Sequence, residues 1–582
     1  MINMYGWFGK ILKVDLTSCR IWREDIEPEL LREYIGGRGL GVRLLRDFFR
    51  LDPFDPEIPL IFATGPLCGS PAPSSARLAI VSRSPLTGTV MDSSCGGSLA
   101  LRLKGSGIDA LHIVGAAKTP VMLLIDGEKA QIIPAETLWG RGVKETLRTL
   151  SPRGSVAAIG PAGENGVLFA GIMTGDGDCS TRGGLGAVMG RKMLKAIVVD
   201  GRTSTKVANP GCFDSAVKDM MRLFLASPFL FGELGIANYG TPALLDLIRQ
   251  RRMTPTENFR KTFFEDSSLY SGAALRKHFK TMDNGCMGCP IQCIKKTQDG
   301  EALPDYDTIS HFGALNNIKS LSDIIGSSMA CHDLGLEAVS AAATISAWGE
   351  WRGRFAEGDE IGKLLKDIAH RNGDGELLSL GSRRAMTVLG VPGLSMSVKS
   401  LELPAYDPRG AYGLALAYCT SNRGGCHMAA LPISHEILRK PVATDRFSLV
   451  GKARINKIAE DAIAAIDSMA TCRLTFLGAT LEEFSELLTA TTGMEYTSGL
   501  LGKIGERIFL TERYYNTCNG FTETDDRLPE RFHMEEGSGG DGIDIPPIDR
   551  QAFLEELLKY YRIRGLKPDG TFSDNDFLLK QP

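Results

Sequence analysis

The sequence has almost no excess of charge and no long apolar run. Its 582 residues include 66 Lys and Arg against 69 Asp and Glu, for a formal net charge of −3. This balance gives no reason to expect nucleic acid or an anionic membrane as a partner. Charged residues also interrupt the N-terminal segment MINMYGWFGKILKVDLTSCR every few positions. We therefore expect neither a secretory signal nor a transmembrane span, and we place the protein in the cytoplasm.

Internal repeats and low-complexity segments are also missing. The composition, with 43% hydrophobic and 23% charged residues, is that of an ordinary globular protein, and the length suggests roughly three to four domain-sized units. A disulfide framework is excluded, because cytoplasmic thiols are kept reduced. The 13 cysteines are therefore core thiols, metal ligands or catalytic groups.

The strand-rich and helix-rich parts of the chain are separated along the sequence. Runs of Val, Ile and Leu bounded by Gly, Pro and Ser predict an N-terminal β-hairpin and then strands in LIFATGPL, ARLAIVSRSPLTGTV, ALHIVGA, VMLLIDG and AIVVDG. Helical patterns dominate later, as in LEAVSAAATISAWGEW, LEEFSELLTATTGM and RQAFLEELLKYYRIRG. We predict an α+β fold, with a β-rich N-terminal domain (1–206) followed by two mainly α-helical domains (207–405 and 406–582).

The stretch GCMGCPIQC places three thiols, Cys286, Cys289 and Cys293, on one tight loop. Structural zinc usually takes two separated Cys-x-x-Cys pairs or added histidines, and a second pair is missing here. A redox Cys-x-x-Cys does not account for the third thiol. A [4Fe–4S] cluster takes four thiolates, often as a compact run plus one distant Cys, with Pro beside a ligand as at Pro290. The spacing favours iron–sulfur, while zinc and plain core thiols stay open.

The chain as a whole resembles the tungsten-dependent aldehyde ferredoxin oxidoreductase family. The resemblance runs in order along nearly the full length. It is carried by GWFGKILKVDLT, YIGGRGLGVRLL, LIFATGPLCGSPAPSSAR, SPLTGTVMDSSCGG, IGPAGEN, RGGLGAVMGRKMLKAI, the cysteine loop, DPRGAYGLALAYCTSNRGGCH and TDDRLPERF.

This resemblance implies a set of cofactors and a role for each domain. It implies a [4Fe–4S] cluster beside a tungsten held by two pyranopterin dithiolenes, with Mg²⁺ between the two pterin phosphates. The resemblance also implies that the N-terminal β-rich domain supports the pterins and that the two helical domains lie above it. Molybdenum binds the same dithiolenes, so both metals stay open.

The resemblance also points to the fourth cluster thiolate. The family uses a motif of the type Asp-x-x-Gly-Leu-Cys, whose Cys completes the cluster. The matching segment here is DSMATC, which keeps Asp467 and Cys472 but has Ala470 and Thr471 in place of Gly-Leu. Cys472 is therefore the expected fourth ligand, and Asp467 and Thr471 are expected pterin contacts. A lone Cys is otherwise most often a buried apolar residue.

Further pterin contacts follow by matching motifs in the first domain. Arg77 in PSSAR matches an Arg that lies between cluster and pterin, where one guanidinium can donate several hydrogen bonds. Ser94 and Gly96 belong to the segment that matches the family's Asn-Ser-Gly-Gly. Ser180 and Arg182 precede GGLGAVMG, and the family's first Arg is Cys179 here. GGLGAVMG lacks the G-x-G-x-x-G pattern and follows polar DCSTR, so we do not assign a dinucleotide site.

The helical part supplies the remaining contacts that the resemblance implies. The family's Asp-x-x-Gly-Leu-Asp reads HDLGLE here, with His332, Leu336 and Glu337 as expected pterin contacts. His332 replaces an Asp, and a neutral His can still accept one hydrogen bond. Arg423 in TSNRGGCH matches another pterin-contacting Arg.

Proton chemistry is assigned to Asp307 and His427. Oxidising an aldehyde to an acid adds a water oxygen and releases electrons and protons, so a base must act near the metal. The family places a Glu and a His there, and the matching positions are Asp307 in DYDT and His427 in RGGCH. The alternatives are a helix cap for Asp307 and an ordinary core histidine for His427.

We therefore predict oxidation of aldehydes to carboxylic acids, with electrons passed through the cluster to ferredoxin or to a small iron–sulfur subunit. The resemblance implies a homodimer. A relative that reduces aromatic acyl-CoA esters is the second reading, because such relatives bind the metal through a protein cysteine and Cys95 and Cys179 are candidates. A non-catalytic redox or structural scaffold is the third, suggested by the changes at Cys179, His332 and Thr471.

Overall fold

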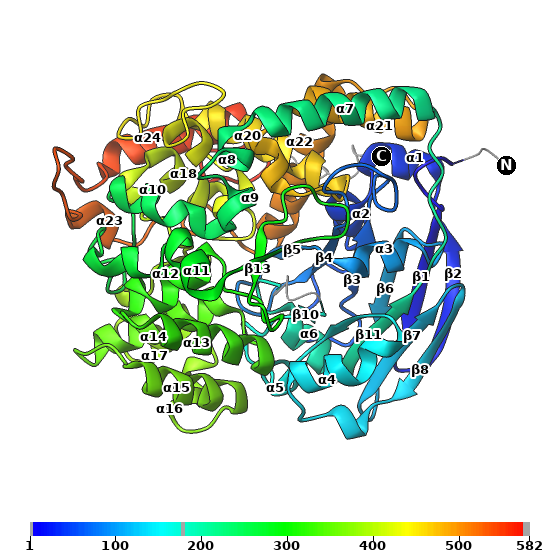
Figure 1. The fold of residues 1–582 in the computed structure, drawn as a ribbon, viewed down its shortest axis with the longest axis horizontal. Coiled ribbons are helices and arrows are strands. Elements are labelled where there is room, and N and C mark those ends of the chain that lie inside the picture. The colour runs from blue at the N-terminus through cyan, green and yellow to red at the C-terminus, as the bar shows by residue number, and fades with distance from the viewer. Residues whose placement is uncertain (1–3, 176–180, 574–582) are drawn as a thin grey trace.

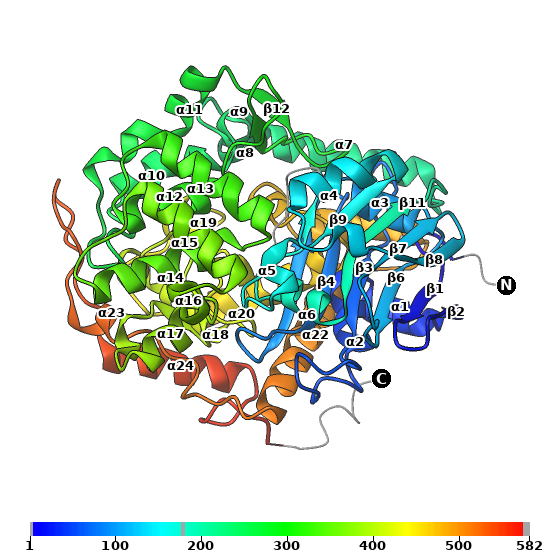
Figure 2. The same ribbon diagram turned by 90° about the horizontal axis from the view of Figure 1, so that it is seen from below.

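The computed structural model describes residues 4–175 and 181–573. In Figure 1 the strand-rich N-terminal part lies on the right and most of the helices that follow lie on the left, while α7 (Pro210–Ala226) and α21 (Leu481–Thr492) lie along the top of the N-terminal part. Turned by 90°, the strands and most of the later helices still lie on opposite sides (Figure 2). The predicted α+β fold, with β-structure first and helices after it, is confirmed. The domain limits at 206 and 405 remain predictions.

The first sheet is six-stranded, in the order β2-β1-β6-β3-β4-β5. The predicted N-terminal hairpin is present, because β1 and β2 pair antiparallel. Strands β3, β4 and β6 are largely buried, as their runs of apolar residues predict. The bounds are β1 (Lys10–Asp15), β2 (Arg20–Asp25), β3 (Leu60–Thr64), β4 (Leu78–Arg83), β5 (Val90–Cys95) and β6 (Ala110–Val114).

The second sheet is five-stranded, in the order β10-β9-β11-β7-β8. Its centre is the parallel pair of β11 and β7. The bounds are β7 (Val121–Asp126), β8 (Lys129–Pro134), β9 (Ser155–Ala158), β10 (Met173–Thr174) and β11 (Leu194–Asp200). Helices α3 (Ser98–Lys104) and α4 (Val143–Leu150) contact β9, and α6 (Leu185–Arg191) contacts β11.

The second part of the chain is mainly helical. Predicted helices are confirmed at α14, α21 and α24. The longer helices are α7 (Pro210–Ala226), α13 (Leu321–Leu334), α14 (Ala338–Trp351), α15 (Gly358–His370), α18 (Tyr412–Thr420), α20 (Lys452–Ser468), α21 (Leu481–Thr492), α22 (Ser498–Cys518) and α24 (Arg550–Ile563). No single helix in the described ranges is long and apolar enough to cross a membrane, although the bent pair Pro210–Ala226 and Pro228–Tyr239 passes by length and composition.

The two parts meet where α2 (Gly37–Leu44) of the N-terminal part packs on α20 and α22. A glycine permits this close contact. Gly37 has a positive φ of 40°, and a Cβ built on it lies 2.2 Å from the carbonyl oxygen of Asp467. Only a residue without a side chain fits here. The contact places the end of α20, which carries Asp467, directly against the first domain.

Candidate active site

The three-cysteine loop is the connection of a small hairpin. Strands β12 (Met282–Asn284) and β13 (Ile294–Lys296) pair antiparallel on either side of it. Cys289 is buried, and its amide donates to the carbonyl oxygen of Cys286 at 3.0 Å. Cys293 forms an isolated bridge with Asn284 at the base of the loop. The hairpin thus holds the ends of the loop together, so its three thiols lie in one turn of chain.

A loop of the first domain, Ser74 to Arg77, joins three of the four predicted cluster cysteines. Ser74 Oγ lies 3.2 Å from Cys289 Sγ, and the carbonyl oxygen of Ser74 accepts the amide of Cys472 at 3.0 Å. Arg77 Nη1 lies 3.9 Å from Cys286 Sγ. The structure therefore brings Cys472 to the same loop as the cysteines near residue 290, although many helices separate them along the chain.

Arg77 connects the cysteine loop to the first predicted pterin segment. Its Nε donates to Ser94 Oγ at 2.8 Å, and its Nη2 donates to the carbonyl oxygen of Ser94 at 3.0 Å. Ser94 lies near the end of β5, and the buried Gly96 follows that strand. One guanidinium thus bridges Cys286 and Ser94, while its contacts with a cluster and a pterin remain predictions.

Asp467 at the end of α20 takes part in a buried cluster of six charged residues. Its two carboxylate oxygens accept Arg473 Nε and Nη2, each at 2.6 Å. Arg38 on α2 binds Glu512 at 2.6 Å and approaches Asp467 at 3.3 Å. All six side chains are less than 10% exposed. The members of this ion cluster are Arg38, Asp92, Arg423, Asp467, Arg473 and Glu512.

The predicted acid–base residues, Asp307 and His427, come from separate elements and face each other. Asp307 lies in α12 (Tyr306–Phe312), and His427 begins the short 3-10 helix η8 (His427–Ala429). Asp307 Oδ2 and His427 Nε2 are 3.9 Å apart. Asp307 Oδ1 accepts the amide of Ala405 at 2.8 Å. The N-cap of α12 is Asp305 and not Asp307, so Asp307 is not the cap that the alternative reading required.

The surroundings shift the pKa of both groups. Burial raises the pKa of Asp307 above its ordinary value. Burial lowers the pKa of His427 to about 3, and the guanidinium groups of Arg182 and Arg473 act in the same direction. At neutral pH the imidazole is therefore uncharged, while Asp307 is a weaker acid than a solvent-exposed Asp.

Tyr406 supports the imidazole from one side. Its ring centroid lies 5.0 Å from that of His427 and 4.9 Å from that of Tyr306. Tyr306 Oη donates to the carbonyl oxygen of Ala405 at 2.5 Å. Tyr406 therefore packs against the His427 ring at an interplanar angle of 46°, and Tyr306 packs against Tyr406 in turn.

Several predicted pterin contacts have buried polar atoms that lack a hydrogen-bond partner within the described residues. They are Arg182 Nε, His332 Nε2 and Arg423 Nη2, and His427 Nδ1 of the acid–base pair is in the same state. Leaving such atoms unpaired costs about 1–3 kcal/mol each. A bound group rich in acceptors and negative charge would satisfy them, so the residues present fit a pterin with a phosphate arm.

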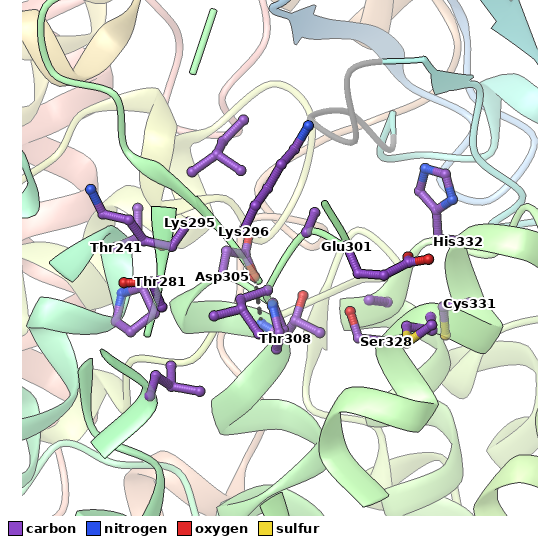
Figure 3. Close-up of a pocket in the computed structure, with 18 of the residues that line it drawn as sticks. Thr241, Thr281, Lys295, Lys296, Glu301, Asp305, Thr308, Ser328, Cys331 and His332 are labelled. Atoms are coloured by element: carbon purple, nitrogen blue, oxygen red, sulfur yellow. Dashed lines mark hydrogen bonds between the residues drawn. The ribbon is translucent and has the colours of Figure 1, made fainter. Parts of the chain in front are cut away.

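The segment HDLGLE (332–337) borders a cavity of about 490 Å³ beside the cysteine loop. Cys293, His332 and Leu336 all line it. Figure 3 shows His332, Glu301 and Cys331 on one side of this space, Thr241 and Lys295 on the other, and the side chain of Lys296, from β13, between them. The cavity therefore lies between the predicted cluster ligand Cys293 and the predicted pterin contact His332.

Glu337 and Thr471 are already engaged in local structure. Glu337 caps α14, accepting the amides of Val339 and Ser340 at 3.0 and 2.9 Å. Its Oε2 lies 3.6 Å from Arg182 Nε. Thr471 Oγ1 donates to the carbonyl oxygen of Ile466 at 3.1 Å. Their predicted pterin contacts remain predictions, as do those of Leu336, Gly96 and Asp467.

Two residues named from the sequence, Cys179 and Ser180, lie outside the described residues. Cys95 is fully buried at the end of β5. In the ranges 4–175 and 181–573 no group of three or more His, Cys, Asp or Glu side chains converges as ligands of a single metal ion. A cluster of four irons keeps its thiolates farther apart than one ion does, so the assignment of the four cysteines remains a prediction.

Sequence reasoning missed four of the six members of this ion cluster: Arg38, Asp92, Arg473 and Glu512. Asp92 and Arg473 sit beside predicted positions, since Asp92 is two residues before Ser94 and Arg473 follows Cys472. Their pairing across the domain contact has no sequence signal. Burial opposes ionisation of Asp92, but Arg38 and Arg423 outweigh it, and the pKa of Asp92 is lowered well below its ordinary value.

Comparison with known proteins agrees with this architecture over nearly the whole chain. The solved structure "Active site complex BamBC of Benzoyl Coenzyme A reductase in complex with 1,5 Dienoyl-CoA" superposes with a TM-score of 0.83 at 24% identity, covering 98% of this chain and 96% of that chain. At this identity the likeness establishes the fold: a β-rich N-terminal part followed by helices.

Sequence comparisons define the family. The model of the aldehyde ferredoxin oxidoreductase N-terminal domain matches residues 11–201, and the model of domains 2 and 3 matches residues 215–577. The tungsten-containing aldehyde ferredoxin oxidoreductase of Pyrococcus furiosus is 36% identical, covering 97% of each chain. That of Thermococcus kodakarensis is 35% identical over the same shares. The chain belongs to the aldehyde ferredoxin oxidoreductase family, as its sequence motifs predict.

Proposed function

We propose that this oxidoreductase oxidises aldehydes to carboxylic acids and passes the electrons to ferredoxin. The observation that carries the proposal is the meeting of Asp307 and His427 beside buried, unpaired polar atoms. It is supported by similarity over 97% of the chain to proteins named tungsten-containing aldehyde ferredoxin oxidoreductase. We also propose a cytoplasmic location and a homodimer.

The residues divide into groups by the cofactor that they would hold. Four thiolates would ligate a [4Fe–4S] cluster: Cys286, Cys289, Cys293 and Cys472. Arg77 would hydrogen-bond to both cluster and pterin, as its contacts with Cys286 and Ser94 suggest. A tungsten–bispyranopterin, with Mg²⁺ between its phosphates, would be held by Ser94, Gly96, Ser180, Arg182, His332, Leu336, Glu337, Arg423, Asp467 and Thr471.

When bound, the tungsten–pterin centre supplies the two-electron chemistry, and the cluster transfers electrons one at a time. The aldehyde and one water yield the acid, two protons and two electrons, so a base must accept a proton. Asp307 is suited to this role because its pKa is raised and its carboxylate is fixed by the Ala405 amide. His427, uncharged and fixed by Tyr406, can hydrogen-bond the substrate oxygen or the water.

The test combines metal analysis with turnover. We expect roughly one tungsten and four irons per chain, and aldehyde-dependent reduction of a viologen dye with at least one member of an aliphatic and aromatic aldehyde panel. A matched preparation grown without tungstate should keep its iron and lose the turnover.

The two alternative hypotheses, a different substrate and a non-catalytic scaffold, predict other outcomes of the same test. Full metal content with no turnover on any aldehyde would contradict the proposal and favour another substrate, such as an aromatic acyl-CoA ester. Iron without tungsten or molybdenum in a tungstate- and molybdate-supplied culture would favour a redox or structural scaffold.

A further inference from the structure

The carboxylate of Asp92 is the point at which three arginines of the ion cluster converge. Asp92 Oδ2 lies 3.0 Å from Arg473 Nη2 and 3.4 Å from Arg423 Nη1. Its Oδ1 lies 3.6 Å from Arg38 Nε. Arg423 Nη1 also donates to the main-chain carbonyl of Asp92 at 3.2 Å. One side chain on β5 thus contacts cations from α2, from the loop after α18 and from the segment after α20.

Two of these arginines adjoin predicted cofactor positions. Arg473 directly follows Cys472, the predicted fourth cluster ligand, and starts the 3-10 helix η9 (Arg473–Leu477). Arg423 is a predicted pterin contact, and its Nη2 is buried without a partner in the described part of the chain. Asp92 holds the other end of the same guanidinium, so Nη2 stays available for a ligand.

The charges of the ion cluster balance, with three carboxylates against three guanidinium groups. Every member is buried: Asp92 is 2% exposed, Arg423 5% and Arg473 7%. Solvent screens interactions between buried charges only weakly. Removing the charge of Asp92 therefore leaves a net positive charge near Cys472 and near Arg77, which joins Ser94 on the same strand to Cys286.

We propose that Asp92 is a positioning residue that orients Arg423 toward the pterin and Arg473 beside Cys472, and that its negative charge keeps the reduction potential of the iron–sulfur cluster low. This inference rests on the proposed function, because it requires the cluster to be present. The potential of such clusters depends on the nearby net charge, on hydrogen bonds and on solvent exposure. A low potential makes the reduced cluster a stronger electron donor to its acceptor.

The test is an EPR-monitored redox titration of the cluster in the metal-loaded enzyme. We expect Asp92→Asn to shift the midpoint to less negative values and Asp92→Glu to stay near the wild type. The matched control is Asp109→Asn, which removes a buried carboxylate paired with Lys104. Asp109 precedes β6, three strands away from β5, or about 14 Å at the usual strand spacing. The Asp109→Asn variant should leave the midpoint potential of the cluster unchanged.

The charge-conserving variant Asp92→Glu distinguishes an effect of charge from an effect of packing. An Asp92→Asn midpoint equal to that of the wild type, at full iron content, would overturn the proposal. So would an equal shift in Asp92→Glu, because packing and not charge would then be responsible.

If Asp92→Asn does not fold, Arg473 provides the same test with the opposite sign. Arg473→Gln should lower the midpoint and Arg473→Lys should preserve it, and equal midpoints for the two would refute the proposal. Iron content and the cluster EPR signal of the wild type are measured first. Their absence would refute the proposed cofactor and, with it, this role of Asp92, whereas equal midpoints at full iron content would refute the role of Asp92 alone.

Discussion

Asp307 Oδ2 and His427 Nε2 lie 3.9 Å apart, on two elements that only the tertiary fold brings together. The distance is too long for a hydrogen bond between the two groups. Space remains for both to act on the same water or substrate oxygen. Each residue is fixed from behind, Asp307 by the Ala405 amide and His427 by the Tyr406 ring. This pair is the basis of the first two predictions.

Replacing either residue should abolish most aldehyde oxidation while the metals remain. Asp307→Asn keeps the size and most hydrogen bonding but removes the base, and His427→Ala removes the imidazole. Loss of a positioned acid or base typically costs about 10²–10⁴-fold in rate. The measurement is viologen reduction normalised to tungsten and iron content. His533→Ala is the control, since this histidine packs on Phe553 and bonds the Ile548 carbonyl. Near-normal turnover in both site variants would show that the assignment is wrong.

The pH profile should identify which of the two groups is the base. Burial raises the pKa of Asp307, so its carboxylate is lost as the pH falls through that raised value, and kcat/KM should fall with it. His427, with a pKa of about 3, stays neutral above about pH 4, so the profile should lack a step near 6.5. The acid limb should disappear in Asp307→Asn. A step near pH 6.5 that persists in this variant would assign the base to another group.

Cys472→Ala should leave an incomplete or labile iron–sulfur cluster. The change removes one of the four proposed thiolates, and metal binding is coupled to folding. Iron per chain, the broad visible absorption and the melting temperature should all decrease. Cys518→Ala, at the end of α22, is the matched control and should behave as the wild type. Full iron with an unchanged spectrum in Cys472→Ala would redirect the search to Cys331 or Cys426, which are both buried.

X-ray absorption at the tungsten edge should show the dithiolene sulfurs and oxygen as ligands, without a further sulfur from the protein. Cys95 is fully buried at the end of β5, within the hydrophobic core. X-ray absorption of the wild type gives the sulfur count, and Cys95→Ser and Cys179→Ser should leave it unchanged. An extra sulfur that disappears in one of these variants would place the enzyme with cysteine-ligated relatives.

Asp526→Asn should destabilise the helical part far more than loss of a surface ion pair. Asp526 is fully buried and binds both Lys399 and Arg513, at 2.5 and 2.8 Å. Removing its charge leaves two buried cations without their partner, at a cost of about 3–5 kcal/mol. Arg550→Gln, which breaks the exposed pair with Glu530, should cost less than about 1 kcal/mol. Urea unfolding followed by circular dichroism compares the two, and equal losses would contradict this expectation.

Local sequence patterns determined much of the secondary structure. The apolar run VMLLIDG became β7, and the amphipathic pattern at the C-terminal end became α24. Both succeed because side-chain periodicity and bounding Gly or Pro act over a few residues. The family motifs were also readable, because they are long and specific. The cysteine spacing alone left iron–sulfur, zinc and core thiols open.

The tertiary structure alone decided which distant groups meet. Ser74 joins Cys289 to Cys472, and Asp92 gathers arginines from three separate segments. These contacts arise where α2 packs on α20, at a distance that Gly37 makes attainable. Pairing of buried charges depends on burial and on the geometry of several segments at once, and neither is encoded in a local pattern. For that reason Asp467 was predicted as a ligand contact, while its partner Arg473 went unnoticed beside Cys472.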